Sequence, residues 1–128
     1  MKKTPKGVAE EIVTFSGVGM SWSGESQPTT DGSYWISYKG PGGTELTVRI
    51  NLEGKIIGVT VEGKQSERYG EWTKVKDAAL NCGSLGLPDD VKSSFKGGEC
   101  SAGLRKDYDW GYVLAGNMNS ILIRIVWE

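Results

Sequence analysis

The residues best suited to chemistry lie in one short run of acidic and aromatic side chains, DYDWGY. Asp107, Tyr108, Asp109 and Trp110 follow one another directly before a predicted strand. Such a run could bind a sugar, or a Ca²⁺ ion, which prefers oxygen ligands. A polar loop whose aromatic residues anchor the edge of a sheet is the simpler interpretation. A hydrolase that uses the two aspartates is a third hypothesis, for which we expect no activity.

Most other catalytic chemistry is excluded by what the sequence lacks. It contains no histidine, so Ser-His and Cys-His nucleophile arrangements and histidine metal ligands are absent. It contains neither a P-loop nor a GxGxxG motif. A second acidic pair, Asp89 and Asp90, stands where a helix N-terminus would favour acids. We therefore predict no catalytic residue, no metal site and no cofactor.

The two cysteines, Cys82 and Cys100, have no histidine to complete a zinc site and do not form a CxxC redox motif. A disulfide between them would join the ends of two predicted helices and would require an oxidising compartment. Two buried free thiols are the alternative. The disulfide interpretation predicts an extracytoplasmic or secreted protein, and the thiol interpretation a cytoplasmic one.

Aromatic residues are numerous, with five tryptophans and five tyrosines. Trp22, Trp35 and Trp110 fall in or beside predicted loops, whereas Trp72 and Trp127 fit a core. Tryptophan is favoured at binding surfaces because it offers a large rigid area with a polar group. The first three tryptophans therefore predict an aromatic binding surface. The alternative is that all five pack in the core or at the sheet edge.

The elements that must position these residues are organised around a predicted hairpin over 44–62. Its apolar face comprises Leu46, Val48, Ile50 and Leu52 in the first strand and Ile57, Val59 and Val61 in the second. Strands alternate their side chains between two faces, so both strands are predicted to be half-buried. Glu53-Gly54 predicts a tight turn between them. A strand over 34–39 completes a three-stranded antiparallel meander.

After the meander, the apolar period changes to three to four residues. Tyr69, Trp72, Val75 and Ala79 predict an amphipathic helix over 66–81. A short helix is predicted over 88–96, with Pro88 at its first position. Residues 4–15 are expected to form a helix or an extended arm, and residues 16–33 a loop with one short strand near 18–22.

The chain ends in a predicted hairpin with strands over 110–115 and 120–127. The second strand is apolar on both faces except at Arg124, which is typical of a central strand. We place it inside the sheet, with the 66–81 helix packed over it. The prediction is a single α+β domain over 1–128, with a loosely structured N-terminal arm over 1–33. Its antiparallel sheet combines the meander with the hairpin, and one amphipathic helix and a short second helix pack on it.

Composition limits the possible partners. The chain has 128 residues, of which 38% are hydrophobic and 24% charged, as in a folded soluble domain. The net charge of −1 gives no electrostatic basis for binding nucleic acid or anionic lipid. No apolar segment is long enough for membrane insertion. We expect the partner to be another protein or a second copy of the chain, with carbohydrate as the alternative.

Residues 31–64 resemble the opening of FMN-binding domains of the type found in flavin-carrying membrane redox subunits. The shared features are Asp31-Gly32-Ser33-Tyr34, a glycine-rich turn, and Gly54-Lys55-Ile56 at a strand start. The resemblance implies an FMN-binding redox domain, in which a later Ser/Thr-Gly-Ala-Thr run contacts the flavin phosphate. The nearest run here, Ser101-Ala102-Gly103, lacks the threonine, so no flavin-binding residue is carried over.

The predicted function is a non-enzymatic binding or assembly module that acts through an aromatic-rich surface. A surface or virion subunit, an inhibitor and an immunity-type protein all fit this description. The FMN-binding redox domain is the alternative. The candidate binding residues are Trp22, Trp35, Asp107, Tyr108, Asp109 and Trp110, and the candidate disulfide joins Cys82 to Cys100.

Overall fold

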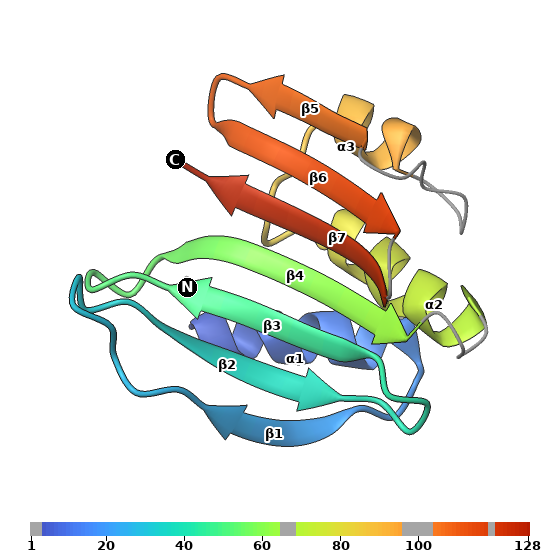
Figure 1. Ribbon diagram of the computed structural model, residues 1–128, viewed down its shortest axis with the longest axis horizontal. Helices are drawn as coiled ribbons and strands as arrows, with labels where there is room; N and C mark the ends of the chain where they lie inside the picture. The colour runs from blue at the N-terminus through green and yellow to red at the C-terminus, as the bar shows by residue number, and fades with distance from the viewer. Residues whose placement is uncertain (1–3, 65–68, 96–103, 118–119) are drawn as a thin grey trace.

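Seven strands form one antiparallel sheet, and the helices cover one of its faces (Figure 1). The computed structural model describes residues 4–64, 69–95, 104–117 and 120–128. Along the chain the elements are α1 (Pro5–Ser16), β1 (Ser21–Glu25), β2 (Tyr34–Lys39), β3 (Glu45–Ile50), β4 (Ile56–Lys64), α2 (Tyr69–Leu80), α3 (Asp89–Ser94), β5 (Leu104–Tyr108), β6 (Gly111–Asn117) and β7 (Ser120–Trp127). The strand order in the sheet is β1-β2-β3-β4-β7-β6-β5.

The α+β class and the antiparallel sheet are confirmed, but the sheet has seven strands and not the five of the predicted three-stranded meander and C-terminal hairpin. β4 pairs with β7 from Gly58–Val126 to Lys64–Ser120, so the N-terminal and C-terminal strands form one sheet. β7 lies between β4 and β6, which confirms its predicted interior position. The edge strand β5 was not predicted, because it lies where the sequence predicts a polar loop.

Helix α1 has clear local start and stop signals. Thr4 is the N-cap, and its hydroxyl accepts a hydrogen bond from Gly7 N at 3.0 Å. Pro5 occupies the first turn, and Gly17 ends the helix with φ of 68°. The helical alternative for residues 4–15 is therefore confirmed. The segment expected as an arm over 1–33 thus contains α1 and β1.

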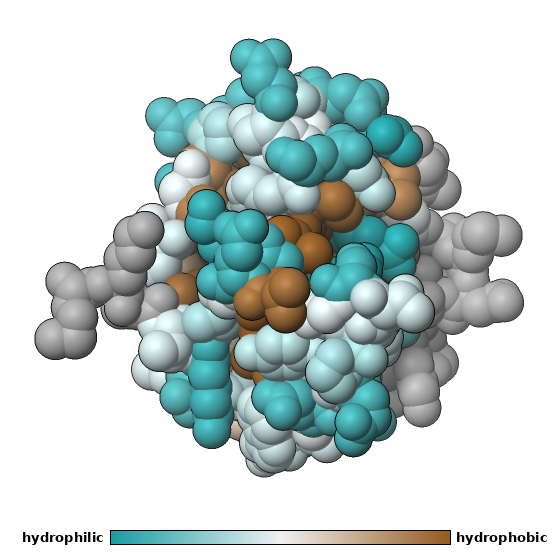
Figure 2. Space-filling model, turned by 90° about the vertical axis from the view of Figure 1, so that its left-hand side faces the viewer, coloured by the Kyte–Doolittle hydropathy of each residue, from teal (hydrophilic) through white to brown (hydrophobic). Residues whose placement is uncertain are grey.

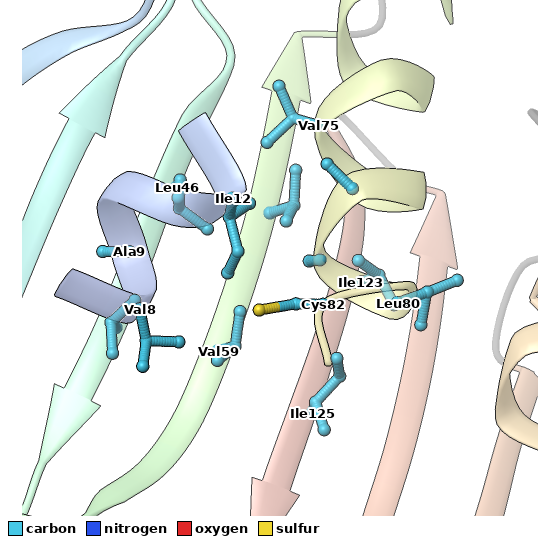
Figure 3. Packing of buried hydrophobic residues seen from close by; sticks show 14 of the residues in the cluster. Val8, Ala9, Ile12, Leu46, Val59, Val75, Leu80, Cys82, Ile123 and Ile125 are labelled. Atoms are coloured by element: carbon cyan, nitrogen blue, oxygen red, sulfur yellow. The ribbon is translucent and has the colours of Figure 1, made fainter. Parts of the chain in front are cut away.

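Helix α2 packs most closely against β4 and α1. Trp72 is buried, and its indole Nε1 donates to Val61 O at 2.9 Å. Figure 3 shows Val75 and Leu80 of α2 on the same side of the sheet as Val8, Ala9 and Ile12 of α1. These side chains and the inward-facing residues of the strands form one core between the helices and the sheet. The predicted helix over 66–81 is confirmed for residues 69–80, although it covers β4 more closely than β7.

Helix α3 is short and is tied to α2 by a buried lysine. Pro88 is its N-cap rather than its first helical residue. Val91 and Phe95 are buried, and the fully buried Lys76 of α2 donates from Nζ to Phe95 O. Lys76 also forms an ion pair with Asp77 Oδ1 at 2.9 Å. No helix in the ranges that the structure describes is long and apolar enough to cross a membrane.

The central hairpin differs from its prediction at the turn. β3 ends at Ile50 and β4 starts at Ile56, so the turn spans five residues rather than two. Leu52, predicted to be on the buried face, lies in this turn and is 79% exposed. Hydrophobic residues are visible between hydrophilic ones at this end of the molecule (Figure 2). Arg49 pairs with Gly58 and Ile50 with Ile56, so Ile57 is the extra residue of a β-bulge.

Candidate functional site

No helix or strand that the structure describes covers the face of the sheet opposite the helices, which is the face toward the viewer in Figure 1. The strand register aligns its residues in rows that cross the sheet. One row comprises Trp35, Arg49, Gly58, Val126, Tyr112 and Asp107. The next row comprises Ser37, Thr47, Thr60, Arg124, Leu114 and Arg105. Aromatic, guanidinium and hydroxyl groups from distant parts of the sequence are thereby neighbours.

A hollow of about 420 Å³ lies on this face, and we call it the open-face hollow. Its lining residues are Trp35, Thr47, Arg49, Ile57, Gly58, Thr60, Tyr112, Arg124, Val126 and Trp127. Gly58 lies between Arg49 of β3 and Val126 of β7 and contributes no side chain. A Cβ at Gly58 would make only ordinary contacts, the nearest being Arg49 Cβ at 3.5 Å. The floor of the hollow is therefore open because this residue is a glycine.

Arg49 is held at one side of the hollow by the loop before β2. Its Nη2 donates to Ser33 Oγ at 3.0 Å and lies 3.7 Å from Asp31 Oδ2. Hydrogen bonds from the side chains of Thr29 and Ser33, then from Ser33 N, lower the pKa of Asp31 well below its usual range. The Arg49 charge adds to this lowering. Asp31 therefore stays ionised and balances the charge of Arg49.

Arg124 occupies the centre of the same face without such a partner. Its side chain is exposed, and it stands opposite Thr60 on β4 and Leu114 on β6. Within the described ranges, no ion pair or hydrogen bond joins Arg124 or the Thr60 hydroxyl to another side chain. Facing residues on neighbouring antiparallel strands have Cβ atoms roughly 5 Å apart. The guanidinium and the hydroxyl can therefore act on one bound group.

The far side of the hollow is stiffened by an arginine that stacks on a tyrosine. Arg105 Cζ lies 4.1 Å from the centroid of the Tyr112 ring. Its Nε and Nη2 donate to Asp107 Oδ1 at 3.1 and 3.0 Å. Asp107, one of the predicted site residues, is thus the ion-pair partner of Arg105 at the sheet edge.

The predicted residues Tyr108 and Trp110 belong to an aromatic cluster on the helix side of the sheet, whose third member, Trp127, reaches the rim of the hollow. Their rings stack with centroids 5.1 Å apart, and Trp110 also packs on Trp127 at 5.8 Å. Tyr108 OH donates to Asp90 Oδ2 at 2.8 Å. Burial, then the hydrogen bond to Asp90 and the negative charge of that carboxylate, raise the pKa of Tyr108 to about 12. Asp109 is exposed in the adjoining turn.

The structure does not bring Trp22 and Trp35 together. Trp22 pairs in register with Tyr38, whose side chain points into the core, so Trp22 lies on the helix side of the sheet. Its ring meets the Tyr38 ring edge-on at 5.4 Å, and Lys6 of α1 lies 4.9 Å above it. Trp35, at 39% exposure, faces the other way into the open-face hollow.

Nine of the ten lining residues were not among the predicted site residues: Thr47, Arg49, Ile57, Gly58, Thr60, Tyr112, Arg124, Val126 and Trp127. A signal for two of them was present in the sequence. Arg49 alternates with apolar residues in the hairpin, and Arg124 is the single charge in an otherwise apolar strand. Both patterns place an arginine on the outward face of a strand. Nothing in the sequence indicated that the two outward faces would adjoin, because that depends on the pairing of β4 with β7.

Cys82 is a free thiol under the helices. Its sulfur points toward the space between α1 and α2 (Figure 3) and lies 3.3 Å from Glu11 Oε2. Burial, then the contact with Glu11, raises the pKa of the Cys82 thiol. The structure shows no disulfide at Cys82 and so gives the predicted pairing no support, and Cys100 lies outside the described residues.

No group of three or more His, Cys, Asp and Glu side chains within the described ranges is placed to hold a metal ion. The open-face hollow instead offers two guanidinium groups, two threonine hydroxyls and the rings of Trp35 and Tyr112. Comparison of the chain with protein-family models, with curated proteins and with solved structures gave no match.

Proposed function

We propose that this protein is a non-enzymatic binding module that acts through the open-face hollow. The observation that carries the proposal is the meeting of Trp35, Arg49, Tyr112 and Arg124 on the uncovered face of the sheet. Tryptophan, tyrosine and arginine are the residues that contribute most often to binding energy at interfaces. The volume of the hollow also falls within the range of ligand sites.

The rigidity of the hollow supports this proposal. Its floor consists of paired strands, Asp31 and Ser33 hold Arg49, and Arg105 stacks on Tyr112. A surface that is ordered before binding loses less conformational entropy when its ligand arrives. The residues first predicted as one aromatic surface are divided between the two faces, so we assign the binding role to Trp35 and not to Trp22.

The test is a thermal-shift screen of sugars, nucleotides, organic acids and peptides against the parent protein and Gly58→Leu. A ligand that binds only the folded state raises the melting temperature. The leucine side chain would fill the floor of the hollow, so shifts due to binding there should disappear. Gly116→Leu is the matched control: Gly116 is on the same face, outside the lining, and a Cβ there meets nothing within 4 Å. Equal shifts in both variants would refute the assignment of the site.

A protein partner or a second copy of the chain is tested separately. Sedimentation velocity of the parent protein and of Trp35→Ala should reveal self-association that depends on the open face. Trp22→Ala removes the same side chain from the helix side and serves as the control. A monomer at all concentrations would exclude self-assembly through this face. Self-association lost in the Trp22 variant alone would place the interface elsewhere.

The alternative function, an FMN-binding redox domain, is favoured by one observation. More than half of the lining residues, including Trp35, Arg49 and Gly58, come from the segment 31–64 that resembles such domains. Titration of the purified protein into FMN tests this alternative. Quenched flavin fluorescence that returns in Gly58→Leu would support it. A colourless protein that leaves FMN fluorescence unchanged would exclude it.

A further inference from the structure

We infer that the open-face hollow takes a small molecule with a flat apolar body and one oxyanion group, a carboxylate or a phosphate. This inference rests on the proposed binding function and names the chemistry of its ligand. It comes from the different chemistry of the two rows that cross the hollow. The first row offers flat and apolar surface beside Arg49, which is already paired with Asp31, and the second row offers hydroxyl groups and Arg124.

The first row is the platform for a flat body. Gly58 and Val126 form its floor, and Trp35 and Tyr112 stand at its two sides. Arg49 lies between Trp35 and Gly58, and its guanidinium is engaged by Ser33 and Asp31. Gly58 is buried although it has no side chain, and its missing Cβ leaves room above the strand. Aromatic side chains pack favourably against flat unsaturated groups. The first row therefore suits a planar ring system better than a branched or strongly hydrated ligand such as a sugar.

The second row supplies the group that selects an anion. Thr60 and Arg124 face each other across the β4–β7 pair, and Thr47 follows on β3. The charge of Arg49 is already balanced by Asp31 at 3.7 Å, whereas Arg124 has no ion-pair partner within the described ranges. An arginine can donate two parallel hydrogen bonds to a carboxylate or a phosphate. Arg124 therefore marks the end of the hollow at which the oxyanion binds.

The acidic side chains around the hollow leave this arrangement intact. Asp31 is engaged by Arg49, Thr29 and Ser33, and Asp107 is engaged by Arg105. Glu62, two residues beyond Thr60, lies outside the lining and has an interaction of its own. Glu45 accepts a hydrogen bond from the hydroxyl of the lining residue Thr47 at 3.4 Å. No acidic residue among those that the structure describes is part of the lining. The charge of the hollow is therefore positive and is concentrated at Arg124.

A matched pair of fluorescent probes tests the inference. Anilinonaphthalene sulfonate carries a sulfonate on a flat aromatic body, and phenylnaphthylamine is the same body without the charge. We expect Arg124→Leu to weaken the sulfonate probe about 10- to 100-fold, as for loss of a charge-assisted hydrogen bond, and to change binding of the neutral probe less than about twofold. Arg124→Lys should recover part of the loss. Lys74→Leu removes an exposed charge on the helix side and should change neither probe.

The outcomes separate this inference from the proposed function. Gly58→Leu should block both probes, with Trp35→Ala as the second variant if the first does not fold. If Gly58→Leu blocks both but Arg124→Leu affects them equally, the oxyanion inference is wrong and the binding site stands. If neither Gly58→Leu nor Arg124→Leu changes the binding of either probe, both proposals are wrong. Competition by naphthoate and naphthyl phosphate then distinguishes a carboxylate from a phosphate, and failure of both to displace the sulfonate would overturn the inference.

Discussion

Glu71 holds the turn between β2 and β3 from helix α2, and its removal should destabilise the whole domain. Its Oε2 accepts a hydrogen bond from Gly42 N at 2.7 Å, and its Oε1 accepts one from Thr44 N at 3.0 Å. Thr44 is buried, so in Glu71→Ala its amide would lose a partner where water does not easily replace it.

The magnitude follows from these two bonds. A hydrogen bond to a charged group contributes about 1.5–3 kcal/mol, and partial exposure of Glu71 favours the lower value. We expect Glu71→Ala to lower the free energy of unfolding by about 2–3 kcal/mol. For a chain of this size this lowers the melting temperature by about 7–11 °C. Lys74→Ala, on the exposed side of the same helix, should change stability by less than about 0.5 kcal/mol.

Gly42 allows the contact to be isolated in a double-mutant cycle. A Cβ at Gly42 would lie 2.7 Å from Glu71 Oε2, so Gly42→Ala should cost about 1–3 kcal/mol in the parent protein. In the Glu71→Ala background the obstructing carboxylate is gone, and the same substitution should cost almost nothing. Urea unfolding followed by circular dichroism measures all four free energies. Additivity within about 0.5 kcal/mol would refute the contact.

Three further predictions follow from close packing and from shifted pKa values. Gly111→Ala should unfold the domain or destabilise it by more than about 3 kcal/mol, because the new Cβ would lie 1.9 Å from a β7 carbonyl oxygen. Gly116→Ala is the control and should leave the melting temperature nearly unchanged. Tyr108 should ionise near pH 12, and Asp90→Asn should lower that value in a carbon-13 NMR titration. Because the folded-state pKa is raised, the stability due to Tyr108 is complete below about pH 10 and is lost as the pH rises toward 12. Cys82 should react with iodoacetamide much more slowly in the native than in the denatured protein, and equal rates in both states would contradict the burial of Cys82. Mass spectrometry with and without reductant will also reveal a disulfide.

Elements with local signals could be predicted from the sequence. α1 has a Thr-Pro start and a terminating Gly17, and β7 has a long apolar run that is interrupted only at Arg124. Both signals are encoded in consecutive residues. β5 has no such signal, because LRKDY is mostly polar and becomes a strand only by pairing with β6. The bulge at Ile57 likewise depends on how β3 and β4 fit together rather than on the residue itself.

The candidate site could be predicted only in part. Trp35 was identified from its residue type, but its grouping with Trp22 failed because neighbouring strands present the two rings on opposite faces. Arg124 was visible as an isolated charge, yet its neighbour Thr60 lies far away in the sequence. Their meeting depends on long-range strand pairing, which no local pattern contains. The sequence therefore indicated which side chains face outward, and the topology decides which of them meet.

The position of β7 inside the sheet also determines when the open-face hollow forms during synthesis. The ribosome makes β7 after every other described element, yet this strand joins β4 to β6. Until it emerges, the Val- and Ile-rich β4 leaves one edge unpaired, open to pairing with other nascent chains. The open-face hollow takes residues from β4 and β7, so it does not exist in that interval. A partly synthesised chain can therefore pack its first strands against its helices, but it does not yet contain the open-face hollow.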